Sequence, residues 1–226
     1  MAMGADINTV FQRALGSDMA RRLLSSGIDL SDQGMNQRYC ARAHVDGSAT
    51  VDLKNASNRV LLFPVVQSFP DDWVEMFLTL REPYGTTERR NDVLSKGPST
   101  AEWFEYAMLS SMGNGFTFEV ETALFFAICK ACGAEDYEIC VYGDDIIVPQ
   151  RIIDTLIPVL GVFGLEVNTA KSFTSGTFFE SCGAYYFHGV DVTPFKIKDL
   201  LDGPKDCIIL ANKIRLFAHL CCHSCG

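Results

Sequence analysis

Two apolar segments in the second half of the chain flank the run Tyr142-Gly143-Asp144-Asp145, which restricts the possible folds more than any other feature. Residues 137–142 and 145–148 have the composition of strands, and the Gly-Asp pair between them predicts a β-hairpin. Two adjacent carboxylates at a hairpin tip repel each other, so the tip is unfavourable unless a cation neutralises it. Mg²⁺ prefers such oxygen ligands. Taken alone, the run also fits an ordinary turn, because Gly-Asp is favoured in hairpins.

A second acidic position favours a metal site over an ordinary turn. Residues 48–53 alternate apolar and polar side chains, which predicts a strand with Asp52 on its polar side. As an isolated residue, Asp52 would be a carboxylate that faces solvent. Together with Asp144 and Asp145 it would supply the third carboxylate of a two-metal site, in which two ions lie about 4 Å apart. Two neighbouring antiparallel strands would bring the three side chains together.

The rest of the chain predicts helices between short strands and antiparallel hairpins, which is an α+β fold and not a regular βαβ alternation. Residues 28–47 and 85–98 predict loops, and residues 172–198 predict short strands with turns at three glycines. The predicted helices cover residues 5–27, a segment from about Ala56, a segment from Asp71 or Asp72, a segment from a capping box at Ser99 and Glu102 to about Met112, residues 116–132, residues 150–163 with a kink at Pro158, and residues 205–219.

Composition narrows the class of protein further. The net charge of −9 has the wrong sign for a surface that binds nucleic acid. The nine cysteines are scattered, which predicts free thiols, and Cys129 with Cys132 predicts a pair of core thiols in a helix. The tail from Cys221 to Cys225 has metal-ligand residue types but no second cluster at finger spacing. No segment reaches the roughly 18 to 20 apolar residues that a membrane span needs.

Several motifs occur in the order and spacing of a known family. From about residue 20 to residue 200, the chain resembles the replicases of single-stranded RNA bacteriophages, the leviviruses. The resemblance rests on Val51-Asp52-Leu53 with Ala56-Ser57, the run Ser110 to Glu119, the run Tyr142 to Ile147, Asn168 with Lys171 and Phe173, the run Glu180 to Ala184, the run His188 to Phe195, and, upstream, Gly27 to Gln33 and Asn36-Gln37-Arg38.

This resemblance implies a right-hand polymerase palm, an antiparallel sheet with packed helices, accompanied by partial fingers and the start of a thumb. It implies partial fingers over residues 1–47, a catalytic palm over 48–198 with inserted fingers elements at about 60–110, and the start of the thumb over 199–226. Family members are much longer, so we expect a fragment that lacks activity alone. The missing parts would then carry the basic groove that the net charge does not provide.

The resemblance also implies roles for individual residues. Asp52 and Asp144 would bind two Mg²⁺ ions, with Mn²⁺ as a substitute, and Asp145 would complete the site. Lys171 matches a position that protonates the leaving pyrophosphate; its alternative is an ordinary exposed lysine. The set expected at nucleotide and template consists of Ser57, Asn58, Gly113, Asn114, Gly115 and Thr117.

One departure from the family concerns Asn58. The family usually has a second aspartate there, near the incoming ribose, and asparagine keeps the hydrogen-bonding capacity without the charge. Arg59, which follows it, is an unexpected charge beside the predicted site.

The implied reaction is nucleotidyl transfer, the RNA-templated synthesis of RNA that replicates a positive-strand phage genome. The implied partners are a single-stranded RNA template, the nascent RNA, ribonucleoside triphosphates and host translation proteins including elongation factors. The implied location is the cytoplasm of the bacterial host, without a membrane.

Three other functions use similar residues. A reverse transcriptase also carries paired aspartates, but usually with a different residue where Gly143 stands. A metal-dependent nuclease needs the carboxylates but not the loop at 113–117. A non-enzymatic RNA-binding module is favoured by the missing fingers sequence, although the three carboxylates would then repel each other without a metal.

Overall fold

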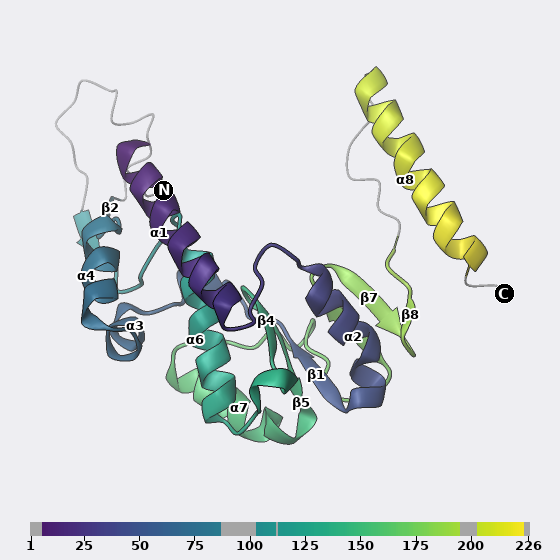
Figure 1. Ribbon diagram of the computed structural model, residues 1–226, viewed down its shortest axis with the longest axis horizontal. Coiled ribbons are helices and arrows are strands. Elements are labelled where there is room, and N and C mark those ends of the chain that lie inside the picture. The colour runs from purple at the N-terminus through teal and green to yellow at the C-terminus, as the bar shows by residue number, and fades with distance from the viewer. Residues whose placement is uncertain (1–5, 87–102, 112, 195–202, 224–226) are drawn as a thin grey trace.

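The computed structural model describes residues 6–86, 103–111, 113–194 and 203–223 (Figure 1). Its centre is an antiparallel sheet of three strands in the order β1-β5-β4. The strands are β1 (Ser48–Val51), β4 (Cys140–Tyr142) and β5 (Asp145–Pro149). Tyr142 pairs with Asp145, so the turn between β4 and β5 consists of Gly143 and Asp144. The predicted strand before Asp52 and the predicted hairpin are therefore confirmed, except that the first hairpin strand begins at Cys140 and not at Tyr137.

Helices cover both faces of this sheet. The sheet residues Ala49, Val51, Val141, Ile146 and Val148 share one hydrophobic core with α6 (Thr117–Ala131) and α7 (Ile153–Val162). On the opposite face, Cys140 and Ile147 pack with residues of α2 (Gly34–Asp46) and with Phe179 of β6 (Phe178–Ser181). Figure 1 shows α6 and α2 on either side of the strands. Because both faces are covered, Thr50 is buried as well, although it lies on the side predicted to be polar.

The helix α2 contradicts the loop predicted for residues 28–47. Its buried residues are Asn36, Cys40 and Ala43, at the helical spacing of four and three positions. Two of the three are small or polar, so the segment lacks the strong apolar stripe that marks a helix in a sequence. Packing against the sheet determines the helix here, and not local hydrophobicity.

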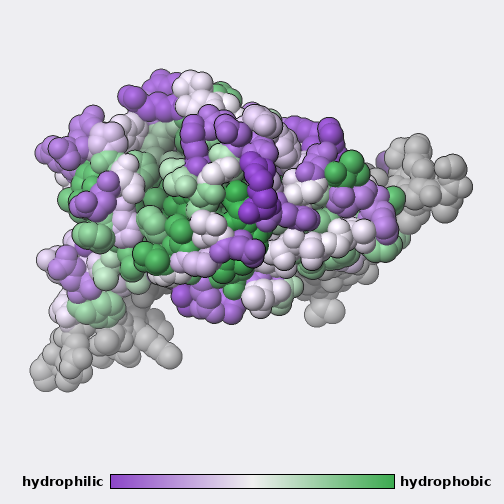
Figure 2. Space-filling view, turned by 90° about the horizontal axis from the view of Figure 1, so that it is seen from below, coloured by the Kyte–Doolittle hydropathy of each residue, from purple (hydrophilic) through white to green (hydrophobic). Residues whose placement is uncertain are grey.

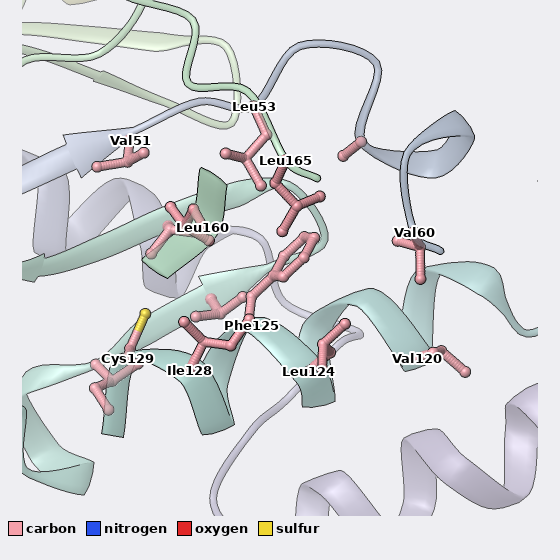
Figure 3. Packing of buried hydrophobic residues seen from close by; sticks show 14 of the residues in the cluster. Val51, Leu53, Val60, Val120, Leu124, Phe125, Ile128, Cys129, Leu160 and Leu165 are labelled. Carbon is pink, nitrogen blue, oxygen red and sulfur yellow. The ribbon is translucent and has the colours of Figure 1, made fainter. Parts of the chain in front are cut away.

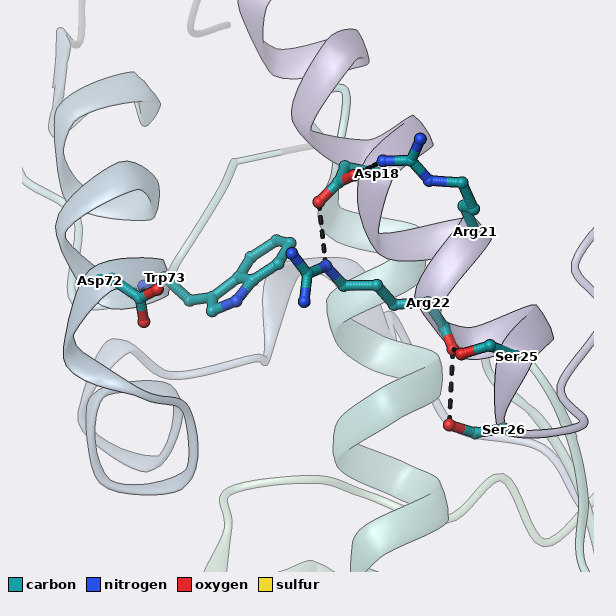
Figure 4. A network of polar contacts seen from close by, with 7 residues as sticks. All are labelled: Asp18, Arg21, Arg22, Ser25, Ser26, Asp72 and Trp73. Carbon is teal, nitrogen blue, oxygen red and sulfur yellow. Dashed lines mark hydrogen bonds and ion pairs between the residues drawn. The ribbon is translucent and has the colours of Figure 1, made fainter.

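A separate layer contains α1 (Asp6–Ser25), α3 (Leu62–Ser68) and α4 (Asp71–Leu80). The side chains of Asn8 and Gln12 in α1 donate hydrogen bonds to the carbonyl of Leu80 at 2.8 and 2.7 Å, and so cap the end of α4. Figure 4 shows the other end of this contact, where the Arg22 guanidinium lies 5.2 Å from the centre of the Trp73 ring. The predicted helices at 5–27 and from Asp71 are confirmed.

Two predicted helices are wrong. From Ala56 only the 3-10 turn η1 (Ala56–Asn58) forms before α3. In place of a helix up to Met112, Trp103–Glu105 is a strand, β3, paired with β2 (Tyr84–Thr86). The backbone after β3 bonds to other segments, because buried Arg81 donates to the carbonyls of Tyr106 and Met108. The predicted capping box at Ser99 and Glu102, and most of the predicted loop at 85–98, lie outside the described residues.

The C-terminal part follows the sequence closely. A second three-stranded sheet contains β6, β7 (Ala184–Phe187) and β8 (Val190–Asp191), and Gly176, Gly183 and Gly189 all have positive φ. Short 3-10 turns η2 (Asp136–Glu138) and η3 (Gln150–Ile152) precede β4 and α7, and Pro158 lies inside α7. The last helix, α8 (Pro204–His223), lies apart from the other elements in Figure 1.

Two absences hold for the described residues. No helix among them combines the length and the hydrophobicity that crossing a bilayer requires. Six of the predicted free thiols are free, at Cys40, Cys129, Cys132, Cys140, Cys182 and Cys207. The side chains of the tail from Cys221 lie outside the described residues.

The core that supports the main sheet is centred on α6. Figure 3 shows Phe125 pointing from this helix towards Leu165, with Leu124 and Ile128 beside it on the same helix. Phe125 has no exposed surface. Apolar residues also reach the surface: Figure 2 shows an area of them on the face seen from below, and Phe63 is 73% exposed.

We expect Phe125→Ala to lower the free energy of unfolding by about 3 to 5 kcal/mol, because it leaves a cavity beneath the sheet. Phe63→Ala, which removes the same side chain from an exposed position, is the matched control and should cost about 0.5 kcal/mol or less. Urea unfolding followed by circular dichroism measures both. Equal losses for the two variants would contradict this assignment of the core.

Candidate functional site

The register of the main sheet places the three predicted aspartates together, where β1 ends and β5 begins. Val51 pairs with Ile146, so Asp52 leaves β1 next to the point where Asp145 begins β5. Asp144 lies in the turn beside it. Segments that are 92 residues apart in the chain, counted from Asp52 to Asp144, therefore meet at the tip of one hairpin.

The helix α6 fixes the conformation of this tip. Gly143 has a φ of 59°, and a Cβ at this position would collide with the ring of Phe118. The Gly143 amide donates a hydrogen bond of 3.0 Å to the Thr122 hydroxyl. The rings of Phe118 and Tyr142 meet edge to face at 4.9 Å between centroids. Both the backbone conformation and the lack of space therefore require glycine before Asp144.

A cavity of about 530 Å³ opens beside this tip, and Asp52 and Asp144 both line it. The predicted residues Ser57, Asn58 and Lys171 line the same cavity. Asn168 donates to Oδ2 of Asp52 at 2.7 Å, and Nζ of Lys171 lies 4.0 Å from Oδ1 of the same carboxylate. The cavity therefore combines two acidic groups with two lysines, Lys171 and Lys54.

The unexpected charge at Arg59 has a partner outside this cavity. Its guanidinium pairs with Glu166 at 2.8 Å, and Lys54 pairs with the same carboxylate at 2.6 Å. Glu166 thus pairs with two cations at the surface, and the three side chains together leave one positive charge next to the predicted nucleotide position.

Asp145 lies differently from the other two aspartates. Its Oδ1 accepts a hydrogen bond of 3.4 Å from the Ser181 hydroxyl. Burial raises the pKa of both Asp144 and Asp145, and neighbouring aspartates raise it further. The turn thus holds two carboxylates that are costly to ionise without a compensating cation.

The residue types fit a hard divalent ion. The available ligands at the cavity are carboxylate oxygens, and the acidic groups are partly desolvated and mutually repulsive. Among the described residues, no three His, Cys, Asp or Glu side chains converge closely enough to hold an ion by themselves. Mg²⁺ is usually bound through one or two carboxylates, with water and phosphate oxygens completing its shell, so Asp52 and Asp144 suffice.

The predicted loop at 113–117 lies at a second cavity. Gly113, Asn114 and Gly115 line this cavity of about 350 Å³ together with Gln12 and Arg13 of α1. It is separate from the cavity of the aspartates, so the structure divides the predicted site residues between two cavities.

Glycines allow the helix and the loop to approach this closely. A Cβ on Gly16 of α1 would collide with the carbonyl of Gly115, and a Cβ on Gly115 would lie 2.7 Å from the amide of Arg13. The buried Thr117 has an internal role, since its hydroxyl donates to Oδ1 of the Asn114 side chain at 2.8 Å.

Sequence reasoning assigned no role to several residues that shape the site. Asn168, Asn36, Ser181 and Cys182 belong to segments that resemble the family, but their contacts depend on the tertiary fold. Glu121 offered a direct signal, because it is a charge inside a helix that is apolar on nearly all sides. It is buried, and one of its oxygens lacks a hydrogen-bond partner among the described residues.

Because the Glu121 carboxyl is buried, we expect the stability of the protein to depend on pH. Burial raises its pKa from 4.5 to about 7. The folded state therefore favours the protonated acid. The free energy of unfolding is highest below pH 4.5, where Glu121 is protonated in both states, and it falls as the pH rises through 7 and the buried carboxyl ionises. We expect Glu121→Gln to stabilise the protein by about 3 kcal/mol at pH 8 and by less than about 1 kcal/mol at pH 5.

Urea unfolding at the two pH values measures this difference. Glu75→Gln, at an exposed position of α4, is the control and should have no effect at either pH. A Glu121→Gln effect that is the same at pH 5 and pH 8 would show that burial does not raise this pKa.

Comparison with known proteins agrees with the motifs. A sequence model of the RNA replicase beta chain matches residues 1–221. The chain is 38% identical over 214 residues to the RNA-directed RNA polymerase beta chain of Escherichia phage MS2, covering 93% of this chain and 37% of that protein. It is 38% identical over 216 residues to the RNA-directed RNA polymerase subunit beta of Escherichia virus Qbeta, covering 93% and 35%.

The chain thus spans little more than a third of the length of these relatives. Among solved structures, a telomerase from Candida albicans aligns with a TM-score of 0.46 and 11% identity over 87% of this chain and 39% of that one, which is too low to carry an argument. The levivirus resemblance of the motifs is confirmed by the sequence relatives: the chain belongs to the RNA replicase beta-chain family.

Proposed function

We propose that this chain is the catalytic palm of an RNA-directed RNA polymerase that replicates a positive-strand RNA phage genome. The observation that carries the proposal is the shared cavity of Asp52 and Asp144, two carboxylates from distant segments beside a rigid turn. The names of the MS2 and Qbeta relatives support the reaction class. The substrates would be ribonucleoside triphosphates, a single-stranded RNA template and the nascent RNA.

Asp52 and Asp144 would hold the divalent ions, and Asn168 would keep Asp52 in orientation through its 2.7 Å hydrogen bond. Two bound Mg²⁺ ions, or Mn²⁺ in their place, would stabilise the attacking and leaving oxygens of the phosphoryl group. Asp145 would support Asp144 from the other side of the turn. Lys171 is charged and lies at the cavity, so it can give a proton to the leaving pyrophosphate.

The two cavities suggest a division of substrate binding. Ser57 and Asn58 line the cavity of the aspartates, where the incoming nucleotide would lie. Gly113, Asn114 and Gly115 line the neighbouring cavity with Arg13, whose charge suits an RNA phosphate. We therefore place the template strand at the second cavity. Residues 48–198 would form the palm, with fingers before it and the thumb after it, and α2 packs directly on the palm sheet.

Primer extension on an RNA template with ribonucleotides and Mg²⁺ tests the proposal, using this chain and a form extended at both ends to the family length. We expect Asp144→Asn to reduce extension by at least about a hundredfold, because one ligand and its charge are lost. Asp154→Asn, on α7, is the matched control and should leave extension unchanged.

The same assay separates the alternative activities. Extension with deoxyribonucleotides alone would favour a reverse transcriptase, and Mg²⁺-dependent degradation of the template would favour a nuclease. Binding of RNA and divalent metal without any extension by the longer form would leave only a binding module.

The turn supplies a second test of the geometry. We expect Gly143→Ala to abolish most of the extension activity, because its Cβ collides with Phe118 and displaces Asp144. Gly176→Ala is the matched control: Gly176 also has positive φ, at 95°, but has no neighbour where the Cβ would stand.

Both variants carry a backbone strain of about 1 to 3 kcal/mol, so thermal unfolding should report similar stability losses from that source. The extension rate should fall only for Gly143→Ala. Equal extension rates in the two variants would mean that the position of Asp144 does not depend on contact with α6.

A further inference from the structure

The loop that follows β1 places a lysine at the cavity of the aspartates. Residues 52–58 form most of the described lining, and Lys54 is one of them. Lys171, the other lysine of the lining, lies 4.0 Å from the Asp52 carboxylate. Nζ of Lys54 instead lies 2.6 Å from Oε1 of Glu166. The partner of Lys171 thus belongs to the cavity, whereas Glu166 is not among the described residues that line it.

The main chain, and not this ion pair, holds Lys54 beside the cavity. The Lys54 amide donates a hydrogen bond of 2.8 Å to the Glu166 carbonyl. The preceding residue, Leu53, forms an antiparallel β-bridge with Val167. Because these contacts join the two backbones, the loop keeps its position when the Lys54 side chain moves.

The ion pair itself can be exchanged for another partner. The side chains of Lys54 and Glu166 are 44% and 46% exposed, and exposed ion pairs contribute little to stability. Glu166 also pairs with the Arg59 guanidinium at 2.8 Å, so its carboxylate stays paired when Lys54 leaves. A lysine side chain is flexible, and its ammonium group can therefore turn from Glu166 towards the cavity that the same residue lines.

The charges at the cavity suit a phosphate ligand for this lysine. A ribonucleoside triphosphate would bring further negative charge to a place where Asp52 and Asp144 already share the divalent ions. Lysine commonly binds phosphate, because its ammonium group is a compact charge with three donors. Asp52 engages Lys171, which leaves Lys54 as the lysine that is available to the phosphates among the described residues of the lining.

We propose that Lys54 binds the triphosphate group of the incoming ribonucleotide and exchanges Glu166 for it. Glu166 keeps the Lys54 charge paired beside the cavity until a nucleotide binds. This inference rests on the proposed function, since it names the part of the substrate that one wall of the same cavity contacts. Arg59 pairs with the same carboxylate but makes no contact with the nucleotide in this arrangement.

The test measures kcat and KM for ribonucleoside triphosphates by primer extension, using the form extended at both ends to the family length. Lys54→Gln should raise the KM about tenfold and change kcat by less than about twofold, because a charge-assisted contact to the bound substrate is lost. Lys54→Arg keeps the charge and should retain most of the affinity. Arg59→Gln is the matched control, because it removes the other ion pair of Glu166 and should leave the KM unchanged.

Glu166→Gln separates substrate binding from a structural role. It weakens the hold on Lys54 without removing the ammonium group, so the KM should stay the same or fall. An unchanged KM in Lys54→Gln would overturn the inference. A KM that rises equally in Lys54→Gln and Glu166→Gln would also overturn it, because the ion pair would then only stabilise the loop. If Asp144→Asn extends primers as well as the unmodified form, or neither extends them, the proposed function has failed and this inference fails with it.

Discussion

The pairing of β1 with β5 is the constraint on which the rest of the site depends. A strand register can shift only in whole residues, and a shift by one would turn every side chain of β1 to the opposite face. Ala49 and Val51 share a core with α6, and Thr50 is buried on the other side, so no shift is available without exposing apolar groups or burying a charge. The position of Asp52 beside the acidic turn is therefore a result of core packing and not of local sequence.

The helix α6 contributes the second half of this geometry. Its inner face packs Phe125 under the sheet, and Thr122 and Phe118, about one and two turns earlier in the helix, hold the hairpin tip. The same helix begins at the 113–117 loop, which lines the second cavity. A single helix therefore sets the position of Asp144 and leads into the loop that lines the second cavity.

Much of this arrangement could be predicted from the sequence, because the relevant signals are local. The hairpin, the strand before Asp52, the buried helix after Phe116 and the final helix all carry their own periodicity or turn residues. The elements that were missed depend on contacts between distant residues. The helix α2 has only Asn36, Cys40 and Ala43 as buried residues, and the segment that follows β3 is held by hydrogen bonds from the Arg81 guanidinium to backbone carbonyls. The division of the predicted site between two cavities could not be foreseen either, since no motif encodes the distance between the loop and the acidic turn.

The close approach of α1 to the 113–117 loop has a mechanical consequence. Where Gly16 meets Gly115, main chain lies against main chain, without flexible side chains between them to absorb a displacement. The amide of Gly115 is also tied to the Gln12 side chain at 3.3 Å, and Gln12 in turn holds the end of α4. A tilt of α1 would therefore move the loop with it, and the shape of the second cavity would change with the orientation of this helix.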